Sequence, residues 1–171
     1  MKRGAFTLVE LMIVVLIIGI VYTLVIVNFK TKESDEKPLS LEKLKSYLQH
    51  FHFKSQVRLL CLDECNECEV IVDGNETARL KHFVDKSIEM YRYDPLRGMV
   101  LLDESYYDKE QERHHVCFSY TMYKNGVGDQ IAAVYKNQAY DFTPYLETVK
   151  VYESINELQS AKEEKIEELK R

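Results

Sequence analysis

The chain has 171 residues, of which 46% are hydrophobic and 30% charged, and its net charge is −5. This length suits one globular domain with a short extension. The composition excludes collagen-like and low-complexity chains and leaves little room for a large two-domain enzyme. The acidic balance argues against a nucleic-acid partner, because affinity for phosphates requires a dense basic face.

The first part of the chain is almost free of charge. Glu10 is the only charged residue between positions 6 and 27. As a helix, this stretch would measure about 33 Å, enough for a hydrocarbon core of roughly 30 Å. It predicts one membrane-spanning helix rather than a cleaved secretory signal, whose shorter apolar core ends at a small-x-small site. Lys2 and Arg3 precede the span and predict a cytoplasmic N-terminus, with the C-terminal bulk outside the cytoplasm.

Glu10 does not fit a simple membrane anchor. A carboxylate near the centre of a spanning helix costs about 2.5–3.5 kcal/mol on insertion scales, so such a group normally has a function and a partner. Glu10 is close to the start of the span and would cost less, and a side chain that reaches the head-group region is the alternative interpretation. The span offers no Lys or Arg. The candidate partner is therefore a free α-amino group at a processed N-terminus, in the same chain or in a neighbouring subunit.

The N-terminal segment resembles that of type IV prepilins and type II secretion pseudopilins. The resemblance rests on a short basic leader, a small residue before Phe6, a Thr-Leu-x-Glu run that ends at Glu10, and a long apolar helix. It implies that a prepilin peptidase removes the leader at the cytoplasmic face and methylates the new N-terminal residue, usually Phe. It also implies that the glutamate at the fifth mature position docks a subunit onto the N-terminal amine of its neighbour, while the long helices bundle into a filament core.

The cleavage site departs from the family pattern, which has Gly immediately before the cut. A cut between Ala5 and Phe6 places Glu10 at the fifth mature position. It leaves Phe6 as the N-methylated residue but puts Ala before the cut. A cut between Gly4 and Ala5 keeps the usual Gly and moves Glu10 to the sixth position. The first cut is favoured, because the spacing of the glutamate decides whether its carboxylate reaches an amine.

Changes in composition divide the chain into consecutive parts. They are a leader (1–5), a transmembrane and assembly helix (6–29), a polar linker (30–38), a head (39–150) and a charged C-terminal helix or tail (151–171). The last part carries a thin apolar stripe within a Glu- and Lys-rich sequence, which is typical of a solvated helix or of a small coiled contact with a partner. The stripe consists of Ile155, Leu158, Ile166 and Leu169.

The head is predicted to be a helix followed by an antiparallel sheet. Apolar residues recur at three- and four-residue spacings after Ser40, a candidate N-cap, and predict an amphipathic helix. They are Leu41, Leu44, Leu48 and Phe51. Short strand-like segments follow at 56–62, 69–73, 86–93, 99–103, 115–123 and 130–135, with turn signals between them. This order predicts an α+β fold, which suits the pilin-like resemblance, and the separate hairpins favour an H-type minor pseudopilin.

The four cysteines form a Cys-x3-Cys-x2-Cys cluster at Cys61, Cys65 and Cys68, with Cys117 far downstream. Export to an oxidising compartment favours disulfides, and four cysteines allow three pairings. We expect Cys61 to pair with Cys68 or Cys65, and the remaining member of the cluster to pair with Cys117. A zinc site of four thiolates is the alternative, whereas an iron–sulfur cluster is disfavoured because the site lies outside the cytoplasm.

Other candidate ligands are weaker. The acidic segment 103–112 could bind calcium, but it lacks EF-hand spacing and contains Lys109, so a solvated loop is preferred. His114 and His115 adjoin a predicted strand, where neighbours point to opposite faces, which disfavours joint ligation of one metal. No catalytic arrangement or phosphate-binding loop can be recognised, so no enzyme activity, cofactor or metal is predicted.

The sequence therefore predicts a non-catalytic, pilin-like subunit, anchored by one span in the inner membrane with its head in the periplasm. Its expected partners are other pilin-like subunits, the prepilin peptidase and the membrane. A minor pseudopilin of a type II secretion system is the preferred member, and a minor pilin of a type IV pilus or DNA-uptake filament is the alternative. The hypothesis from another class is a membrane-tethered metal or redox protein built on the cysteine cluster.

Overall fold

A computed structural model of the chain describes residues 8–30, 39–108, 110–145 and 147–170. The chain divides into two units, Met1–Lys37 and Pro38–Arg171, and each is described by itself. The second is called the globular unit here. Among the described residues it contains every strand, so the sheet expected from the sequence lies wholly within it.

The described part of the first unit is the helix α1 (Leu8–Lys30), with the sequence LVELMIVVLIIGIVYTLVIVNFK. The predicted assembly helix is therefore a helix from Leu8 onward, and its first two residues lie outside the described part of the chain. None of the helices in the described residues meets the combined length and hydropathy expected of a membrane-spanning segment.

The globular unit begins with a shorter helix than the sequence predicted for residues 40–51. A 3-10 turn, η1 (Leu41–Lys43), leads into the α-helix α2 (Leu44–Gln49). Ser40 has the extended backbone of an N-cap, but its side chain makes no capping hydrogen bond. The apolar stripe nevertheless faces the core as predicted, because Leu41, Leu44 and Leu48 are all buried.

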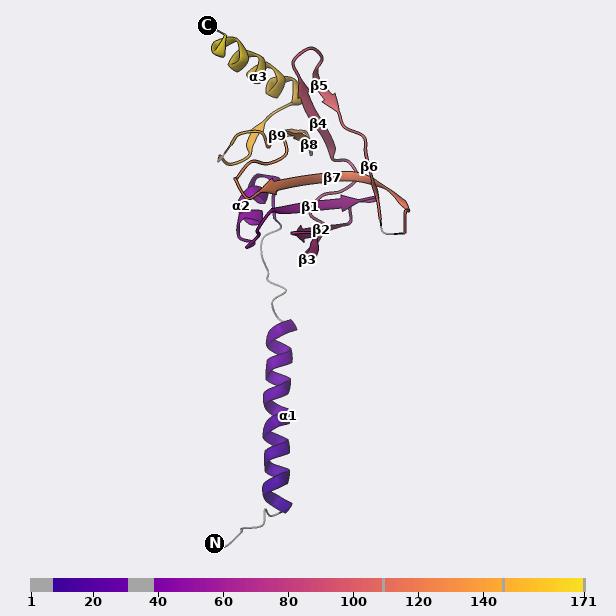
Figure 1. Ribbon diagram of the computed structural model, residues 1–171, viewed down its shortest axis with the longest axis vertical. Coiled ribbons are helices and arrows are strands. Elements are labelled where there is room, and N and C mark those ends of the chain that lie inside the picture. Colours follow the sequence, from indigo (N-terminus) through magenta and orange to yellow (C-terminus); the bar gives the residue numbers. More distant parts are fainter. Residues whose placement is uncertain (1–7, 31–38, 109, 146, 171) are drawn as a thin grey trace. The chain divides into compact units, whose positions relative to one another are not determined.

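Within the described residues, ten strands form two antiparallel five-stranded sheets (Figure 1). The first sheet has the order β3-β2-β1-β7-β6 and the second has the order β10-β9-β8-β4-β5. The strands are β1 (Gln56–Leu62), β2 (Glu67–Val72), β3 (Asn75–Lys81), β4 (Glu89–Asp94), β5 (Gly98–Leu101), β6 (Glu104–Tyr107), β7 (Arg113–Tyr123), β8 (Ala132–Tyr135), β9 (Gln138–Asp141) and β10 (Lys150–Tyr152). The predicted order of a helix and then an antiparallel sheet, an α+β fold, is confirmed.

The centre of the first sheet is the pair β1 and β7. Strand β1 lies between β2 and β7, and its middle residues Leu59 and Leu60 are both buried although they point to opposite faces. The first sheet is therefore covered on both faces at its centre. This explains why the sequence of β1 contains a run of apolar residues rather than a strict alternation of apolar and polar residues.

Some strands were missed because they lie at sheet edges or are very short. Strand β3 reads NETARLK and is largely exposed, which an edge position tolerates because charged side chains there oppose edge-to-edge pairing. Strand β6 lies inside the segment 103–112, which was expected to be a solvated loop. That expectation is wrong for β6, because hydrogen bonding to β7 makes it an edge strand. The short strands β9 and β10 were also missed.

The main core of the globular unit is aromatic at its centre. The rings of Tyr120 and Phe142 lie 4.9 Å apart, and those of Phe118 and Phe142 lie 5.9 Å apart. The three side chains are at most 1% exposed. They belong to the same buried cluster as the leucines of η1 and α2, so the short helix contributes directly to the core of the sheets.

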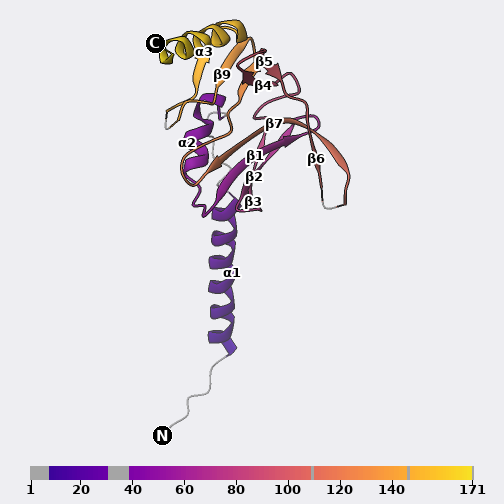
Figure 2. The ribbon, with the colours of Figure 1, turned by 45° about the horizontal axis from the view of Figure 1, so that its top comes forward.

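The C-terminal segment is the helix α3 (Ile155–Leu169), which lies beside the strands of the second sheet (Figure 2). Its N-cap is Ser154, whose Oγ accepts the Glu157 N–H at 3.2 Å. Leu158 is fully buried in a small cluster with Ala132 and Ala139 of the second sheet. The stripe that was expected to be solvated or to meet a partner is therefore packed, at Leu158, on the chain itself.

Candidate functional site

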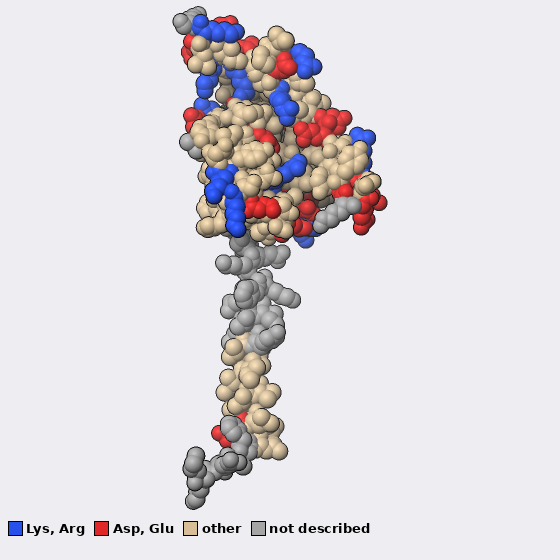
Figure 3. Space-filling model, in the orientation of Figure 1, with Lys and Arg blue, Asp and Glu red and all other residues tan. Residues whose placement is uncertain are grey.

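The candidate assembly site is the N-terminal part of α1. Glu10 lies in the first turn of this helix, where the helix dipole favours negative charge. The apolar side chains around it are at least 60% exposed: Leu8, Val9, Leu11 and Met12. Figure 3 shows the described part of α1 as an uncharged surface apart from an acidic group near its N-terminal end, and the uncharged side chains there are apolar. Such a surface requires apolar surroundings, which other helices or lipid can supply.

The residues of the predicted cleavage site lie outside the described part of the chain. These are Gly4, Ala5 and Phe6, for which both cuts stay predictions. The structure places the carboxylate of Glu10 on a helix that begins, as described, two residues earlier at Leu8.

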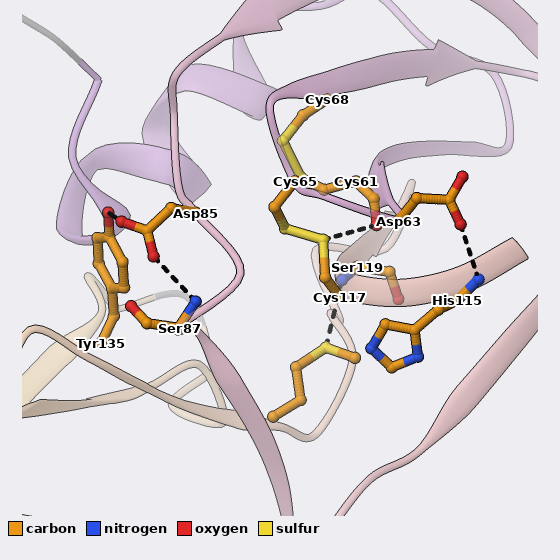
Figure 4. Close-up of a disulfide and its surroundings, with 11 residues drawn as sticks. Cys61, Asp63, Cys65, Cys68, Asp85, Ser87, His115, Cys117, Ser119 and Tyr135 are labelled. Atoms are coloured by element: carbon orange, nitrogen blue, oxygen red, sulfur yellow. Dashed lines mark hydrogen bonds between the residues drawn. A yellow bond between two sulfur atoms is a disulfide. The ribbon is translucent and has the colours of Figure 1, made fainter.

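The cysteines form two disulfides in the globular unit (Figure 4). Cys61 pairs with Cys68, and these residues lie opposite one another on β1 and β2 with their Cα atoms 4.1 Å apart. Cys65 pairs with Cys117 and so links the β1–β2 turn to β7 across a sequence separation of 52. The sequence left open whether Cys61 pairs with Cys68 or with Cys65. The structure contains the first alternative, in which the remaining Cys65 pairs with Cys117. It leaves no free thiol for a four-thiolate zinc site.

The β1–β2 turn is also tied to β7 by Asp63, which sequence reasoning did not single out. Asp63 has a positive φ of 53°, a left-handed backbone that Asp adopts more readily than most residues. Its N–H donates to the carbonyl oxygen of His115 at 2.8 Å, and its carboxylate accepts the His115 N–H at 3.2 Å. These bonds and the Cys65–Cys117 disulfide fasten one loop to one strand (Figure 4).

His114 lies between two carboxylates. Its Nδ1 is 2.8 Å from Asp63 Oδ2 and its Nε2 is 3.4 Å from Asp108 Oδ2. The hydrogen bond to Asp63 and then that to Asp108 raise the pKa of His114. The hydrogen bond from His114 lowers the pKa of Asp63, and backbone N–H donation from Glu112 lowers that of Asp108. The arrangement favours an imidazolium between two carboxylates.

The same region contains the one possible metal-binding group found among the described residues. Asp108, Glu112 and His114 bring ligand atoms within 4.8 Å of one another. His115 does not join them, in agreement with the predicted opposite directions of neighbouring strand residues, and its ring faces Asp103 at 3.6 Å. Because each ring nitrogen of His114 already faces a carboxylate, a hydrogen-bonded network accounts for this geometry without an ion.

Two hollows lie beside the second sheet. A groove of about 350 Å³ runs beneath α3, and its lining combines basic and apolar side chains: Arg92, Tyr93, Gln130, Thr143, Lys162, Lys165, Ile166 and Leu169. A second, more polar cavity of about 220 Å³ lies between the two sheets and shares Arg92 with the groove. The sequence offered no sign of either, because each is assembled from segments that are far apart in the chain.

Comparison with known proteins gives one match. Residues 1–26 match the family model of the prokaryotic N-terminal methylation motif. The matched segment includes Phe6 and Glu10 and supports a type IV pilin-like chain, a class that is processed by a prepilin peptidase and assembles with other pilins. No curated protein and no solved structure matches the chain.

Proposed function

We propose that this chain is a structural subunit of a pilin-like filament, and specifically a minor pseudopilin of a type II secretion system. The observation that carries the proposal is the N-terminal methylation motif at residues 1–26. Within it, Glu10 stands where a cut before Phe6 makes it the fifth mature residue. The function is non-catalytic, and its partners are other pilin-like subunits, the prepilin peptidase and the inner membrane.

Assembly in this proposal is an electrostatic pairing followed by apolar packing. Cleavage before Phe6 creates a positive α-amino group, which can pair with the carboxylate of Glu10 in an apolar environment. The amine of one subunit and the Glu10 of its neighbour neutralise each other and set the axial register. The exposed apolar surface of α1 then packs against other helices in the filament core.

The globular unit is the part that the filament displays in the periplasm. Its two disulfides suit an oxidising compartment outside the cytoplasm. The separate hairpins β1–β2, β4–β5 and β8–β9 support the H-type minor pseudopilin as the preferred member. The disulfides also disfavour a metal or redox protein built on the cysteine cluster, because they remove the thiolates that such a site needs.

The alternative is a minor pilin of a type IV pilus or of a DNA-uptake filament. Both kinds of assembly system recognise the same N-terminal segment, so the motif favours neither. The neighbouring genes distinguish them, because protein-secretion genes favour a pseudopilin, whereas pilus or competence genes favour the alternative.

The first experiment is the mass of the N-terminal peptide of the protein extracted from membranes. We expect a peptide that begins with N-methylated Phe6. The matched control is the same protein from cells that lack the prepilin peptidase, which should retain Met1 and the leader. A peptide that begins at Ala5 would move Glu10 to the sixth position, and an intact leader in peptidase-positive cells would overturn the proposal.

The docking role of Glu10 is tested by Glu10→Ala. We expect the variant to be processed and to reach the membrane but to be lost from filaments, because the N-terminal amine of its neighbour has no carboxylate to meet. Cross-linking to neighbouring pilin-like subunits in the membrane and periplasm measures incorporation, and Val9→Ala, next to it on the same helix, is the control. Incorporation of Glu10→Ala at the level of the control would contradict the docking role.

A further inference from the structure

The groove beneath α3 exists because this helix is packed on the second sheet through its first half. Leu158 is fully buried against that sheet, and Lys162, Ile166 and Leu169 continue the same helical face at three- and four-residue steps. Along the later part of this face the helix borders a hollow of about 350 Å³ instead of a packed core, and Leu169 is 81% exposed. The apolar stripe of α3 therefore runs out of the core into the groove.

The lining of the groove is positively charged. It contains Arg92, Lys162 and Lys165 and no acidic side chain. The buried carboxylate of Asp141, outside the lining, lies 2.9 Å from Lys162 Nζ and balances its charge. Arg92 faces Glu104 only at 3.9 Å, and both side chains are substantially exposed, so this pair contributes little. Lys165 is exposed and forms no ion pair within the described part of the chain. The three cations thus meet two acids, and the lining keeps an excess of positive charge.

The shape and the polar groups of the groove favour a polypeptide as its occupant. The groove is open to solvent rather than enclosed, and its volume is near the lower end of the roughly 300–1,000 Å³ of ligand pockets. An extended chain can lie along such a groove and direct alternate side chains into it. Gln130 donates through Nε2 to the Gly128 carbonyl oxygen at 3.0 Å, which leaves its Oε1 to accept a peptide N–H. A lipid acyl chain could not use this acceptor.

We propose that the groove binds an extended acidic segment of a partner protein. Carboxylates of the segment pair with Lys165 and Arg92, and one large apolar side chain packs on Ile166 and Leu169. The backbone of the segment meets Gln130. This contact is separate from the assembly role of α1 and gives the globular unit a binding surface of its own.

The test is a titration of the ¹⁵N-labelled full chain, in neutral detergent micelles, with the peptide acetyl-Ser-Glu-Gly-Phe-Gly-Glu-Ser-amide. In an extended conformation both Glu side chains and the Phe side chain of this peptide point to one side. The backbone amide signals of Lys165, Ile166 and Leu169 report binding. We expect them to shift and saturate. Matched peptides with Lys in place of Glu, or with Ser in place of Phe, should bind at least about fivefold more weakly.

Lys165→Glu reverses one charge of the lining at an exposed position. We expect about tenfold weaker binding of the acidic peptide and a new preference for the basic one, a reversal that a loss of folding cannot produce. Leu169→Ala should weaken binding of the acidic peptide about threefold through lost apolar contact. The matched control is Lys86→Glu, which makes the same charge change at an exposed position outside the groove and should bind like the wild type.

Failure of the acidic peptide to saturate these signals in the wild-type protein would overturn the proposal. Equal binding of the basic peptide, or an unchanged preference in Lys165→Glu, would do the same. Saturation by phosphatidylglycerol added to the micelles, with none by the peptide, would identify an anionic lipid surface as the occupant. Shifts of the same signals when the protein alone is concentrated would identify a second copy of the chain. Either of these results would also overturn the proposal.

Discussion

Asp141 is the one buried carboxylate among the described residues, at 4% exposure. It is bonded to Lys162 Nζ at 2.9 Å and accepts both the N–H and the hydroxyl of Thr143. Nearby, Lys45 of α2 donates to the carbonyl oxygen of Pro144 at 2.7 Å, and burial lowers the pKa of this lysine while Asp141 opposes the effect. Asp141 thus connects α3 to the end of β9.

We predict that Asp141→Ala destabilises the globular unit by about 3 kcal/mol, near the lower end of the range for breaking a buried pair, because Lys162 retains some exposure. Urea unfolding of the wild-type and variant proteins measures the change. The control is Lys150→Ala, which breaks a pair with Glu147 that is about half exposed on both sides and should cost less than about 1 kcal/mol. Equal losses in the two variants would contradict the structural role of Asp141.

His114 should make stability depend on pH. Its pKa is raised above 6.5, so its bonds to Asp63 and Asp108 stabilise the fold below that value and are lost as the pH rises through the raised pKa. The pKa values of both carboxylates are lowered from 3.8, so their contribution is present above that value and is lost as the pH falls through the lowered values. The network should therefore stabilise the protein most between about pH 4 and pH 6.5.

We predict that the difference in thermal midpoint between the wild-type protein and His114→Gln is largest near pH 5.5 and shrinks by pH 8.5, because the wild type loses its imidazolium bonds there. Thermal unfolding at a series of pH values measures the difference. His52→Gln, at an exposed position outside the strands, should give a difference that does not follow this pattern. A gap between wild type and His114→Gln that widens with rising pH would reverse the assigned sign.

At the scale of elements, α3 is held by few contacts. One side chain of its apolar stripe, Leu158, is fully buried against small residues of the second sheet, whereas Leu169 near its end is 81% exposed. The capping bond from Ser154 fixes the start of the helix. The helix is therefore anchored at its first turns, and its last turn borders the groove.

We predict that Leu158→Ala costs about 2–5 kcal/mol, because it leaves a cavity beside Ala132 and Ala139 that small residues cannot fill. Leu169→Ala on the same helix removes the same atoms from an exposed position and should change stability by no more than about 0.5 kcal/mol. Denaturant unfolding followed by far-UV circular dichroism measures both. Similar effects of the two substitutions would show that α3 does not pack as described.

At the scale of the whole globular unit, the two disulfides constrain very different lengths of chain. Cys61–Cys68 closes a loop with a sequence separation of 7 between strands that are already paired, whereas Cys65–Cys117 has a separation of 52. In the chain-entropy view, the cost of unfolding grows with the length of the loop that a disulfide closes. The second disulfide should therefore contribute more to the stability of the unit.

We predict that Cys65→Ser with Cys117→Ser costs about 4 kcal/mol, and that Cys61→Ser with Cys68→Ser costs about 2 kcal/mol. Urea unfolding under oxidising conditions compares the two double variants with the wild type. The matched control repeats the comparison in excess reductant, where the disulfide contribution to the differences should disappear. A larger loss from the short loop would show that local contacts, rather than loop length, decide the effect.

Features that depend only on residues close together in the chain could be predicted from the sequence alone. The apolar run after Phe6, the lone Glu10 and the basic leader carry the methylation motif, and the strand β1 has the bounds that its composition predicted. Turn chemistry placed the connection between β4 and β5, because Asp94 and Gly98 favour a reversal. Such signals depend on neighbours in the chain and are therefore visible before folding.

What only the tertiary structure decided depends on contacts between distant residues. The edge strands β3 and β6 are polar and exist because they hydrogen-bond to neighbours, so their own sequences carry little strand signal. The pairing of Cys65 with Cys117 and the position of His114 between Asp63 and Asp108 require β7 to lie beside the β1–β2 turn. Arg58 lies between two apolar residues of β1, a pattern that in sequence predicts a side chain on the solvent face of a strand. Only the packing of one sheet on the other buries its Nε. The N-terminal sequence thus determined what the chain resembles, whereas long-range packing decided where its buried charges lie.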